Sequence, residues 1–142
     1  KPITVESDQS IYETIKLMAR QDASCVVVLS GDKPEGIFTE RDVLKRVAVR
    51  DVDTRRTPIK EVMTAKVIVM LYSALVGEVL AEMYERGVRN MPILEEKGEL
   101  AGVVSMSDVL GYARALDVDE SVRKAWKEVE RFWESEEHYT PG

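Results

Sequence analysis

The sequence predicts an α+β fold in which two similar β-α-β-β-α repeats are followed by a C-terminal amphipathic helix. Three observations lead to this fold class. A nine-residue pattern occurs twice, apolar runs of strand length alternate with stretches of helical periodicity, and the repetition ends near residue 116 of 142. A unit of about 60 residues buries too little surface to be stable alone. We therefore expect the two repeats to pack together as a pseudo-two-fold pair.

The repeated pattern has the form G-x-x-[ST]-x-x-D-V-L. It occupies residues 36–44 and returns 66 positions later at residues 102–110. Further upstream the offset is 65, because one extra residue lies within 95–101, and residues 25–29 then align with 90–94. The predicted organisation is a first repeat, a second repeat and a C-terminal tail, at residues 1–57, 58–116 and 117–142.

Each repeat begins with a short apolar segment, predicted to be a strand, at residues 3–5 and 67–71. A stretch with apolar residues at helical spacing follows, which predicts an amphipathic helix. The apolar positions are Ile11, Ile15 and Met18 in the first repeat, and Val76, Val79, Leu80, Met83 and Tyr84 in the second.

The middle of each repeat contains two apolar strands joined by a short polar loop with glycine, as in a hairpin. The predicted strands are 25–29 with 36–39, and 90–94 with 100–105. A second helix then begins after Thr39 and after Ser105. Its expected buried face is formed by Val43, Leu44 and Val47 in one repeat and by Val109, Leu110 and Ala113 in the other.

The segments outside the repeats have different characters. Residues 50–58 are charged and lack apolar periodicity, so we expect them to cross the surface. The tail starts with acidic residues suited to the positive end of a helix and continues with an apolar face that must be buried, either on its own module or on a partner. The acidic residues are Asp117, Asp119 and Glu120, and the apolar face comprises Val122, Ala125, Trp126, Val129, Phe132 and Trp133.

Composition excludes several classes of protein. Twenty basic and 26 acidic residues give a net charge of -6, which opposes sequence-independent binding to nucleic acid. One cysteine, Cys25, and one histidine, His138, form neither an internal disulfide nor a Cys/His zinc site. No apolar run approaches the roughly 20 residues that span a bilayer. With no signal-peptide pattern at its start, the chain is expected to be cytoplasmic.

The two repeats resemble the tandem cystathionine-β-synthase-type (CBS) domain pair, also called a Bateman module. The resemblance rests on the duplicated motif, on Val62-Met63-Thr64 at the start of the second repeat, and on residues 87–94. It implies a regulatory module that binds adenine nucleotides in clefts between the repeats. The ligand would most often be AMP, ADP or ATP, and sometimes S-adenosylmethionine or NAD. It also implies pairing into flat dimers.

The Ser/Thr and Asp of the motif allow two interpretations. Thr39 with Asp42, and Ser105 with Asp108, have the spacing by which a side chain at a helix start and an acid three residues later cap the first turn. The same junction suits a phosphorylated nucleotide, because amides at a helix N-terminus attract phosphate. The acid can accept hydrogen bonds from ribose hydroxyls. Asp42 and Asp108 are therefore the predicted ribose ligands, with plain capping as the alternative.

Other candidate ligand contacts lie around these junctions. Arg41 and Ser107 can reach a phosphate from the helix start, or can be merely exposed. Arg89 and Asn90, which precede Met91 and Pro92, match a family position that often faces phosphates. The equivalent position of the first repeat holds Ser24 and Cys25. We therefore expect the two clefts to be unequal. Family members sandwich adenine at the positions of Ile3, Thr4, Val67 and Ile68, which can equally be core, and Lys66 is a candidate phosphate contact that can equally be an ordinary surface lysine.

The leading functional prediction is a stand-alone homodimeric nucleotide sensor without a catalytic domain, read by an unidentified partner. An enzyme is disfavoured because the sequence offers no Ser/His/Asp or Cys/His arrangement and no metal-binding carboxylate motif. A structural dimerisation module without a ligand, or a module for S-adenosylmethionine or NAD, is the alternative.

Overall fold

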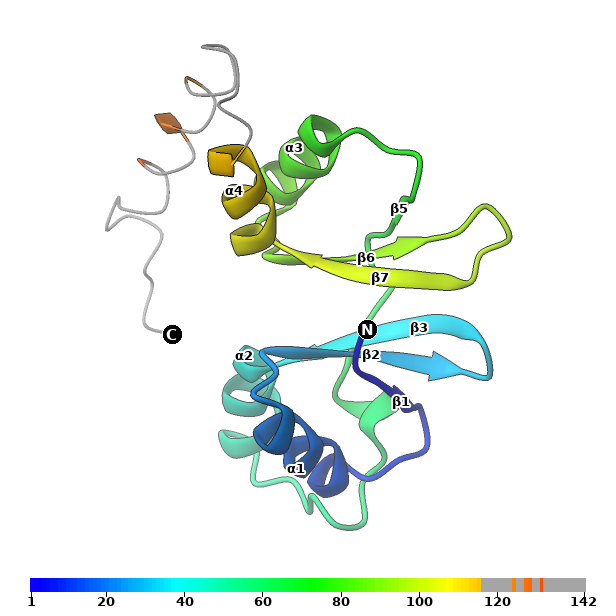
Figure 1. The fold of residues 1–142 in the computed structure, drawn as a ribbon. Helices are drawn as coiled ribbons and strands as arrows, with labels where there is room; N and C mark the ends of the chain where they lie inside the picture. The colour runs from blue at the N-terminus through cyan, green and yellow to red at the C-terminus, as the bar shows by residue number, and fades with distance from the viewer. Residues whose placement is uncertain (116–123, 125–126, 129–130, 132–142) are drawn as a thin grey trace. The chain divides into compact units, whose positions relative to one another are not determined.

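A computed structural model describes residues 1–115 together with residues 124, 127, 128 and 131 (Figure 1). These residues have a mixed α+β fold in which helices alternate with the strands of two sheets. The chain divides into two compact units. One contains Lys1–Ser73 and Asn90–Val103, and the other contains Ala74–Arg89 with the described residues from Val104 onward. In the described part of the chain no helix is long and apolar enough to cross a membrane.

The first sheet has four strands in the order β1-β2-β3-β4. Strand β1 (Thr4–Glu6) runs parallel to β2 (Cys25–Ser30), and β3 (Lys33–Thr39) is antiparallel to β2. The two residues of β4 (Thr64–Ala65) continue the sheet beside β3. The predicted hairpin is confirmed, but its strands are longer than expected. The turn narrows to two residues because Gly31 adopts a φ of 62°, which favours glycine.

The second sheet has the order β5-β6-β7. Strands β6 (Asn90–Leu94) and β7 (Leu100–Ser105) have the predicted bounds. Strand β5 is parallel to β6 but contains only Met70–Leu71, so the predicted strand at 67–71 is too long. The chain turns at Lys66, whose φ is 57°, and only the last two residues of the apolar run reach the edge of β6.

The first helix of each repeat is confirmed. Helix α1 (Ile11–Gln21) begins at Ser10, whose Oγ accepts a hydrogen bond from the Glu13 amide at 3.2 Å, and it buries Ile11 and Met18. Helix α3 (Val76–Arg86) buries Val79 and Met83. Its apolar face is narrower than the sequence pattern suggests, since the outer members of that pattern, Val76 and Tyr84, are exposed.

The second helices differ between the repeats. Helix α2 (Glu40–Asp42) continues into a π-helical segment, Val43–Ala48, whereas α4 (Met106–Ala115) is a regular α-helix. Val47 and Val109 are buried as predicted. The predicted burial of Leu44 is wrong, since its side chain is 65% exposed. The reason is the wider π turn, in which residues three apart no longer share one face. Of the other predicted face residues, Val43 and Leu110 are half-buried, and the side chain of Ala113 lies outside the described residues.

The first unit has a continuous apolar core beneath its sheet. Residues from the segment after the first repeat take part in it: Ile59 is fully buried, and Val62 and Met63 are nearly so. The remaining core residues come from β1, α1, β2, β3 and the π-helical segment: Val5, Ile11, Met18, Val26, Val28, Phe38 and Val47. The start of the second repeat at residue 58 stays a prediction.

The charged segment at residues 50–58 runs over the surface, as predicted, but is tied to the start of α1. The Ile11 amide donates to the Thr57 carbonyl and the Tyr12 amide to the Thr54 carbonyl, at 3.0 and 2.9 Å. Arg55 lies over the Tyr12 ring, 4.0 Å from its centre. The predicted apolar face of the tail and its acidic start lie outside the described residues; Lys124, Lys127, Glu128 and Arg131 are helical and exposed.

Candidate functional site

The motif of the first repeat forms a reciprocal cap at the start of α2. Thr39 ends β3, and its hydroxyl oxygen accepts a hydrogen bond from the Asp42 amide at 3.4 Å. In return, Oδ2 of Asp42 accepts hydrogen bonds from the Thr39 amide at 2.9 Å and from the Thr39 hydroxyl at 3.0 Å. The capping interpretation of the spacing is therefore observed at this junction.

The other oxygen of Asp42 pairs with a residue that the sequence analysis did not single out. Nε of Arg46 lies 3.3 Å from Oδ1 of Asp42. Nη1 of the same guanidinium donates to the Met63 carbonyl at 2.6 Å and to the Val62 carbonyl at 3.3 Å. Asp42 is only 8% exposed. Both carboxylate oxygens are thus engaged, and the helix start is joined to the segment before β4.

The motif of the second repeat caps α4 in the same way but is open to solvent. Oδ2 of Asp108 accepts from the Ser105 amide at 2.9 Å, and the Asp108 amide donates to Oγ of Ser105 at 3.0 Å. Hydrogen bonding from the Ser105 backbone, and to a smaller extent from the Ser105 side chain, lowers the pKa of the Asp108 carboxyl. No group in the described part of the chain bonds to its Oδ1. The position that corresponds to Arg46 holds Tyr112, which is exposed.

One backbone hydrogen bond recurs at equivalent positions of the two repeats. The Glu40 amide donates to the Ser24 carbonyl at 3.1 Å, and the Met106 amide donates to the Arg89 carbonyl at 2.8 Å. Each bond joins the residue before the second strand of a repeat to the first residue of its second helix. The structure therefore brings Ser24 to the first motif and Arg89 to the second.

Cys25 lies opposite Thr39 in the β2–β3 register and is half-buried. Burial raises the pKa of its thiol, and a hydrogen bond with the Ser24 side chain acts in the opposite direction. The thiol is therefore protonated at neutral pH and is not an activated nucleophile.

The remaining candidates are distributed over both units. The side chains of Arg41 and Ser107 are exposed beside the motif aspartates, and that of Arg89 is exposed before β6. Met91 and Pro92 are buried, and Asn90 is half-buried. Ile3 packs against the core of the first unit, while Thr4, Val67 and Ile68 are half-buried and Lys66 is exposed. The second unit contains four of the candidates, namely Arg89, Ser105, Ser107 and Asp108, and the first unit contains all the others.

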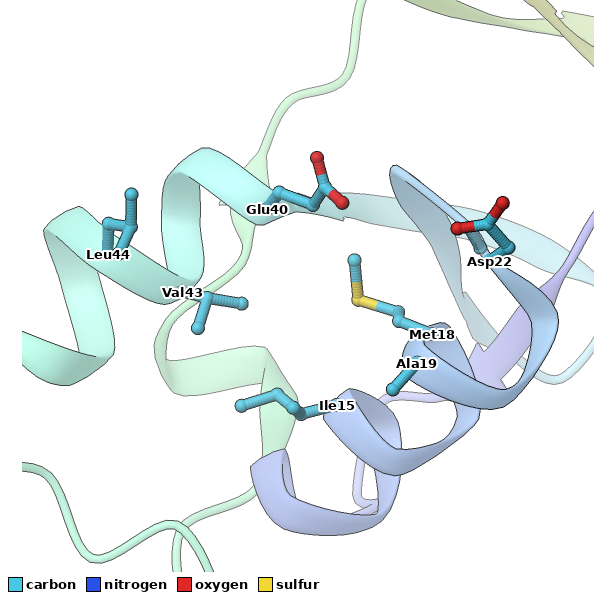
Figure 2. Close-up of a pocket in the computed structure, with 8 residues that line it drawn as sticks. Ile15, Met18, Ala19, Asp22, Glu40, Val43 and Leu44 are labelled. Atoms are coloured by element: carbon cyan, nitrogen blue, oxygen red, sulfur yellow. The ribbon is translucent and has the colours of Figure 1, made fainter.

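A hollow of about 370 Å³ opens in the first unit between α1 and the helix that begins with α2 (Figure 2). Met18 points into it, with Ile15 and Ala19 on one helix and Val43 and Leu44 on the other. The carboxylates of Asp22 and Glu40 stand at the same opening. An apolar lining with two acids disfavours a phosphate, and this hollow is therefore suited to apolar side chains rather than to a nucleotide.

Among the described residues, no three His, Cys, Asp or Glu side chains gather closely enough to hold a metal ion. The motif junctions can therefore bind a ligand through hydrogen bonds and charged side chains.

Comparison with known proteins gives consistent results. The family model of the CBS domain matches twice, at residues 1–49 and 59–115. An uncharacterized 17.7 kDa protein of Acidianus ambivalens is 35% identical over 117 residues, which are 82% of this chain and 68% of that protein. An uncharacterized protein of Methanopyrus kandleri is 31% identical over 125 residues, 87% of this chain and 64% of that protein. The chain thus spans about two thirds of the length of these relatives.

Solved structures share the fold. A putative signal-transduction protein with CBS domains from Burkholderia ambifaria superposes with a TM-score of 0.76 at 33% identity, covering 84% of this chain and 87% of that one. A CBS domain protein from Pyrobaculum aerophilum, complexed with AMP, has a TM-score of 0.70 at 23% identity, covering 75% and 82% of the two chains. With two family matches that together take in the duplicated sheets, helices and capped motifs, this chain belongs to the CBS domain family.

Proposed function

We propose that the chain is a regulatory module that binds an adenine nucleotide, AMP in the first place and ADP or ATP as well, and signals to a partner protein. The observation that carries the proposal is the duplicated junction in which a Ser or Thr at a strand end caps a helix together with an aspartate, at residues 39–42 and 105–108. A carboxylate fixed in this way can accept hydrogen bonds from ribose hydroxyls, and the cap of α4 uses only Oδ2 of Asp108.

Two solved relatives support an adenosine ligand. The Pyrobaculum aerophilum protein was solved with AMP, and the CBS domain pair of protein MJ0100 with 5'-methylthioadenosine and S-adenosyl-L-methionine. Adenosine is the part these ligands have in common. For a nucleotide, the phosphate contacts of this chain are proposed to be Arg41, Arg89, Ser107 and Lys66. The other proposed ligand contacts are Ile3, Thr4, Ser24, Cys25, Thr39, Ile68, Asn90, Met91, Pro92 and Ser105, and the proposed ribose ligand is Asp42 or Asp108.

A thermal-shift titration with AMP, ADP, ATP, NAD and S-adenosylmethionine tests the proposal, with GMP as the control for the base. Ligand at 100 times its Kd stabilises a protein by about 2.7 kcal/mol. For a chain of this length that corresponds to a rise in Tm on the order of 8–10 °C. No shift with any adenine compound at millimolar concentration favours a structural module without a ligand. Conversion of ATP to AMP by the purified protein would instead indicate an enzyme, whereas we propose a non-catalytic module.

A homodimer is also proposed, in which a second copy covers the hollow between α1 and α2. The support is the apolar lining of this hollow and the exposure of Leu44, at 65%. Such a side chain at the edge of an apolar hollow is well placed for contact with another copy. Light scattering should give the dimer mass for the wild type and a lower mass for Leu44→Glu. Val49→Glu is the control, because Val49 is also an exposed apolar residue, 81% exposed, but does not line the hollow.

The tail is proposed to add to this assembly through its aromatic face. Deleting residues 117–142 should change the mass measured by light scattering from that of a dimer to that of a monomer if the tail crosses to the partner. If the tail packs on its own chain, the deletion should lower only the Tm. An unchanged mass together with an unchanged Tm would contradict burial of the tail. The proposed location of the protein is the cytoplasm.

A further inference from the structure

The start of α1 is covered by residues 51–62, which we call the covering segment. The amides of Ile11 and Tyr12, the first two residues of the helix, donate to carbonyls of this segment at 3.0 and 2.9 Å. Ile11 and Ile59 belong to the same core, and both side chains are fully buried. The covering segment thus supplies acceptors for the first amides of the helix and keeps its first apolar residue out of water.

The start of α3 has no such cover among the described residues. By the 65-residue offset between the repeats, Val76 and Gly77 correspond to Ile11 and Tyr12. The amides of Val76 and Gly77 donate to no carbonyl in the described part of the chain. Val76 is 45% exposed, and Leu75 beside it is 69% exposed. An apolar patch and two amides at the start of α3 are therefore open to a further segment of chain.

A weaker repetition of sequence continues beyond residue 116, where the repeated motifs end. The tripeptide Asp-Val-Asp at residues 51–53 returns at residues 117–119, again with the offset of 66. The tripeptide Lys-Glu-Val at residues 60–62 returns at residues 127–129, one residue later than this offset. The two tripeptides keep their order and nearly their spacing, so the tail contains a second copy of the covering segment.

The two copies also share a pattern of exposure. In the first copy the Lys-Glu pair at residues 60–61 is helical and exposed, and its neighbours Ile59 and Val62 are buried. The Lys-Glu pair at residues 127–128 is likewise helical and exposed. Residues three apart on a helical turn lie on one side of it. The apolar residues that flank the pair in the second copy are Trp126 and Val129.

Chain length favours a contact within one molecule. Helix α4 ends at Ala115 and belongs to the same unit as α3, which has 11 residues. The roughly ten residues from Ala115 to Ala125 can span about 33 Å, whereas α3 is about 16 Å long. The tail is therefore long enough to reach the start of α3 in its own chain.

We propose that residues 117–129 cover the start of α3 in the same chain, as residues 51–62 cover the start of α1. Trp126 takes the place of Ile59 and buries Val76, and carbonyls of the tail accept hydrogen bonds from the first amides of α3. The remaining aromatic residues of the tail lie beyond the repeated segment and stay available for the assembly proposed above. The proposal does not depend on the proposed nucleotide ligand.

The fluorescence of Trp126 tests this contact in the full chain. Trp133→Phe leaves Trp126 as the sole tryptophan, and burial should protect it from quenching by acrylamide. Val76→Lys adds a charge to the contact and should move the emission and the quenching toward those of the unfolded chain. Val69→Lys is the matched control, because Val69 is 38% exposed and belongs to the other unit.

Thermal unfolding gives the size of the effect. Trp126→Ala should lower the Tm by about 10 °C, the loss expected for a buried aromatic side chain in a chain of this length. In a Val76→Lys background the same substitution should lower the Tm by less than about 3 °C, because the contact is already lost. Leu75→Lys provides a second measurement if Val76→Lys does not fold.

A disulfide identifies the chain that covers α3. Ser10 and Pro58 form an antiparallel bridge in the first unit, and their counterparts by the offsets above are Leu75 and Ala125. Leu75→Cys combined with Ala125→Cys should cross-link within one chain on mild oxidation, because bridged residues are close enough for a disulfide. Cys25→Ser removes the native thiol from these variants, and non-reducing electrophoresis separates cross-links within a chain from those between chains.

The control pair is Leu75→Cys with Glu134→Cys, which lies beyond the repeated segment and should cross-link more slowly. A cross-link between chains overturns the proposal, because a second copy then covers α3. Equal cross-linking rates for the two pairs overturn it as well, and so does Trp126 emission that Val76→Lys leaves unchanged. None of these measurements uses a nucleotide, so failure of the proposed function leaves their outcome unaffected.

Discussion

The glycine at the start of the motif should be required for stability in the first repeat, where it is Gly36, but not in the second, where it is Gly102. A Cβ built on Gly36 would collide with the Sδ of Met63 and lie 2.9 Å from its Cγ and 3.0 Å from the Thr64 carbonyl oxygen. A Cβ on Gly102 would meet no described heavy atom within 4 Å. Neither glycine has a positive φ, so alanine fits the backbone at both positions and the comparison isolates packing.

The expected magnitude follows from overpacking. Met63 is 9% exposed and packs in the core, so a new methyl group must displace a buried side chain or shift β4. Such insertions cost about 1–3 kcal/mol, or a fall in Tm of roughly 3–12 °C at about 3–4 °C per kcal/mol for this chain length. Gly102→Ala should leave the Tm unchanged or raise it slightly, since alanine is favoured over glycine within a strand by about 0.5–1 kcal/mol.

Thermal unfolding of both variants, followed by circular dichroism, measures the difference. Gly36→Ala in a Met63→Ala background should cost less than in the wild type, because the colliding side chain is absent; the double-mutant cycle then gives the coupling between the two positions. Equal Tm values for Gly36→Ala and Gly102→Ala, or a coupling of zero, would refute the packing argument.

Three further predictions concern single side chains. Because the pKa of Asp108 is lowered in the folded protein, its cap stabilises the fold at pH values above the unfolded pKa of about 3.9, and this stabilisation is lost as the pH falls through the folded pKa. The difference in Tm between the wild type and Asp108→Asn should therefore be constant above about pH 5 and vanish in acid, whereas a difference that does not depend on pH would contradict this. Burial raises the pKa of Cys25, so a thiol reagent should label the native protein slowly at pH 7 and faster in denaturant, whereas rapid native labelling would show an activated thiol. Ser10→Ala removes the cap of α1 and should cost about 1 kcal/mol in unfolding experiments, with the exposed Ser73→Ala as a control that should cost less.

Local patterns in the sequence were sufficient to predict most of the fold. Strands β6 and β7 are apolar runs between polar loops, and α1 has apolar residues at helical spacing with a serine before its first turn. The family match and the structural neighbours confirm the two CBS repeats. The extent of β5 and the existence of β4 were not predictable in this way. Each contains two residues, too few for any periodicity, and each is defined by pairing with a strand distant in sequence.

Local patterns were also sufficient to predict part of the candidate site. The spacing of Thr39 with Asp42 and of Ser105 with Asp108 indicates caps, and both caps are present. The ion pair between Asp42 and Arg46 was also visible in the sequence, because an acid and a base four residues apart face each other on a helix. The hydrogen bonds from Arg46 to the Val62 and Met63 carbonyls were not visible, since backbone carbonyls exist at every position and leave no signature in the sequence.

A single segment explains why equivalent motifs have become unequal. Residues 59–65 follow the first repeat, add Ile59, Val62 and Met63 to its core, and pair with β3 as β4. The same segment covers Gly36 with the Met63 side chain and presents the carbonyls that hold Arg46 against Asp42. Because the chain continues from this segment into the second repeat, the first motif is mechanically connected to the start of that repeat. Any change that loosens Asp42, Arg46 or Gly36 should therefore disturb the segment that leads into the second repeat.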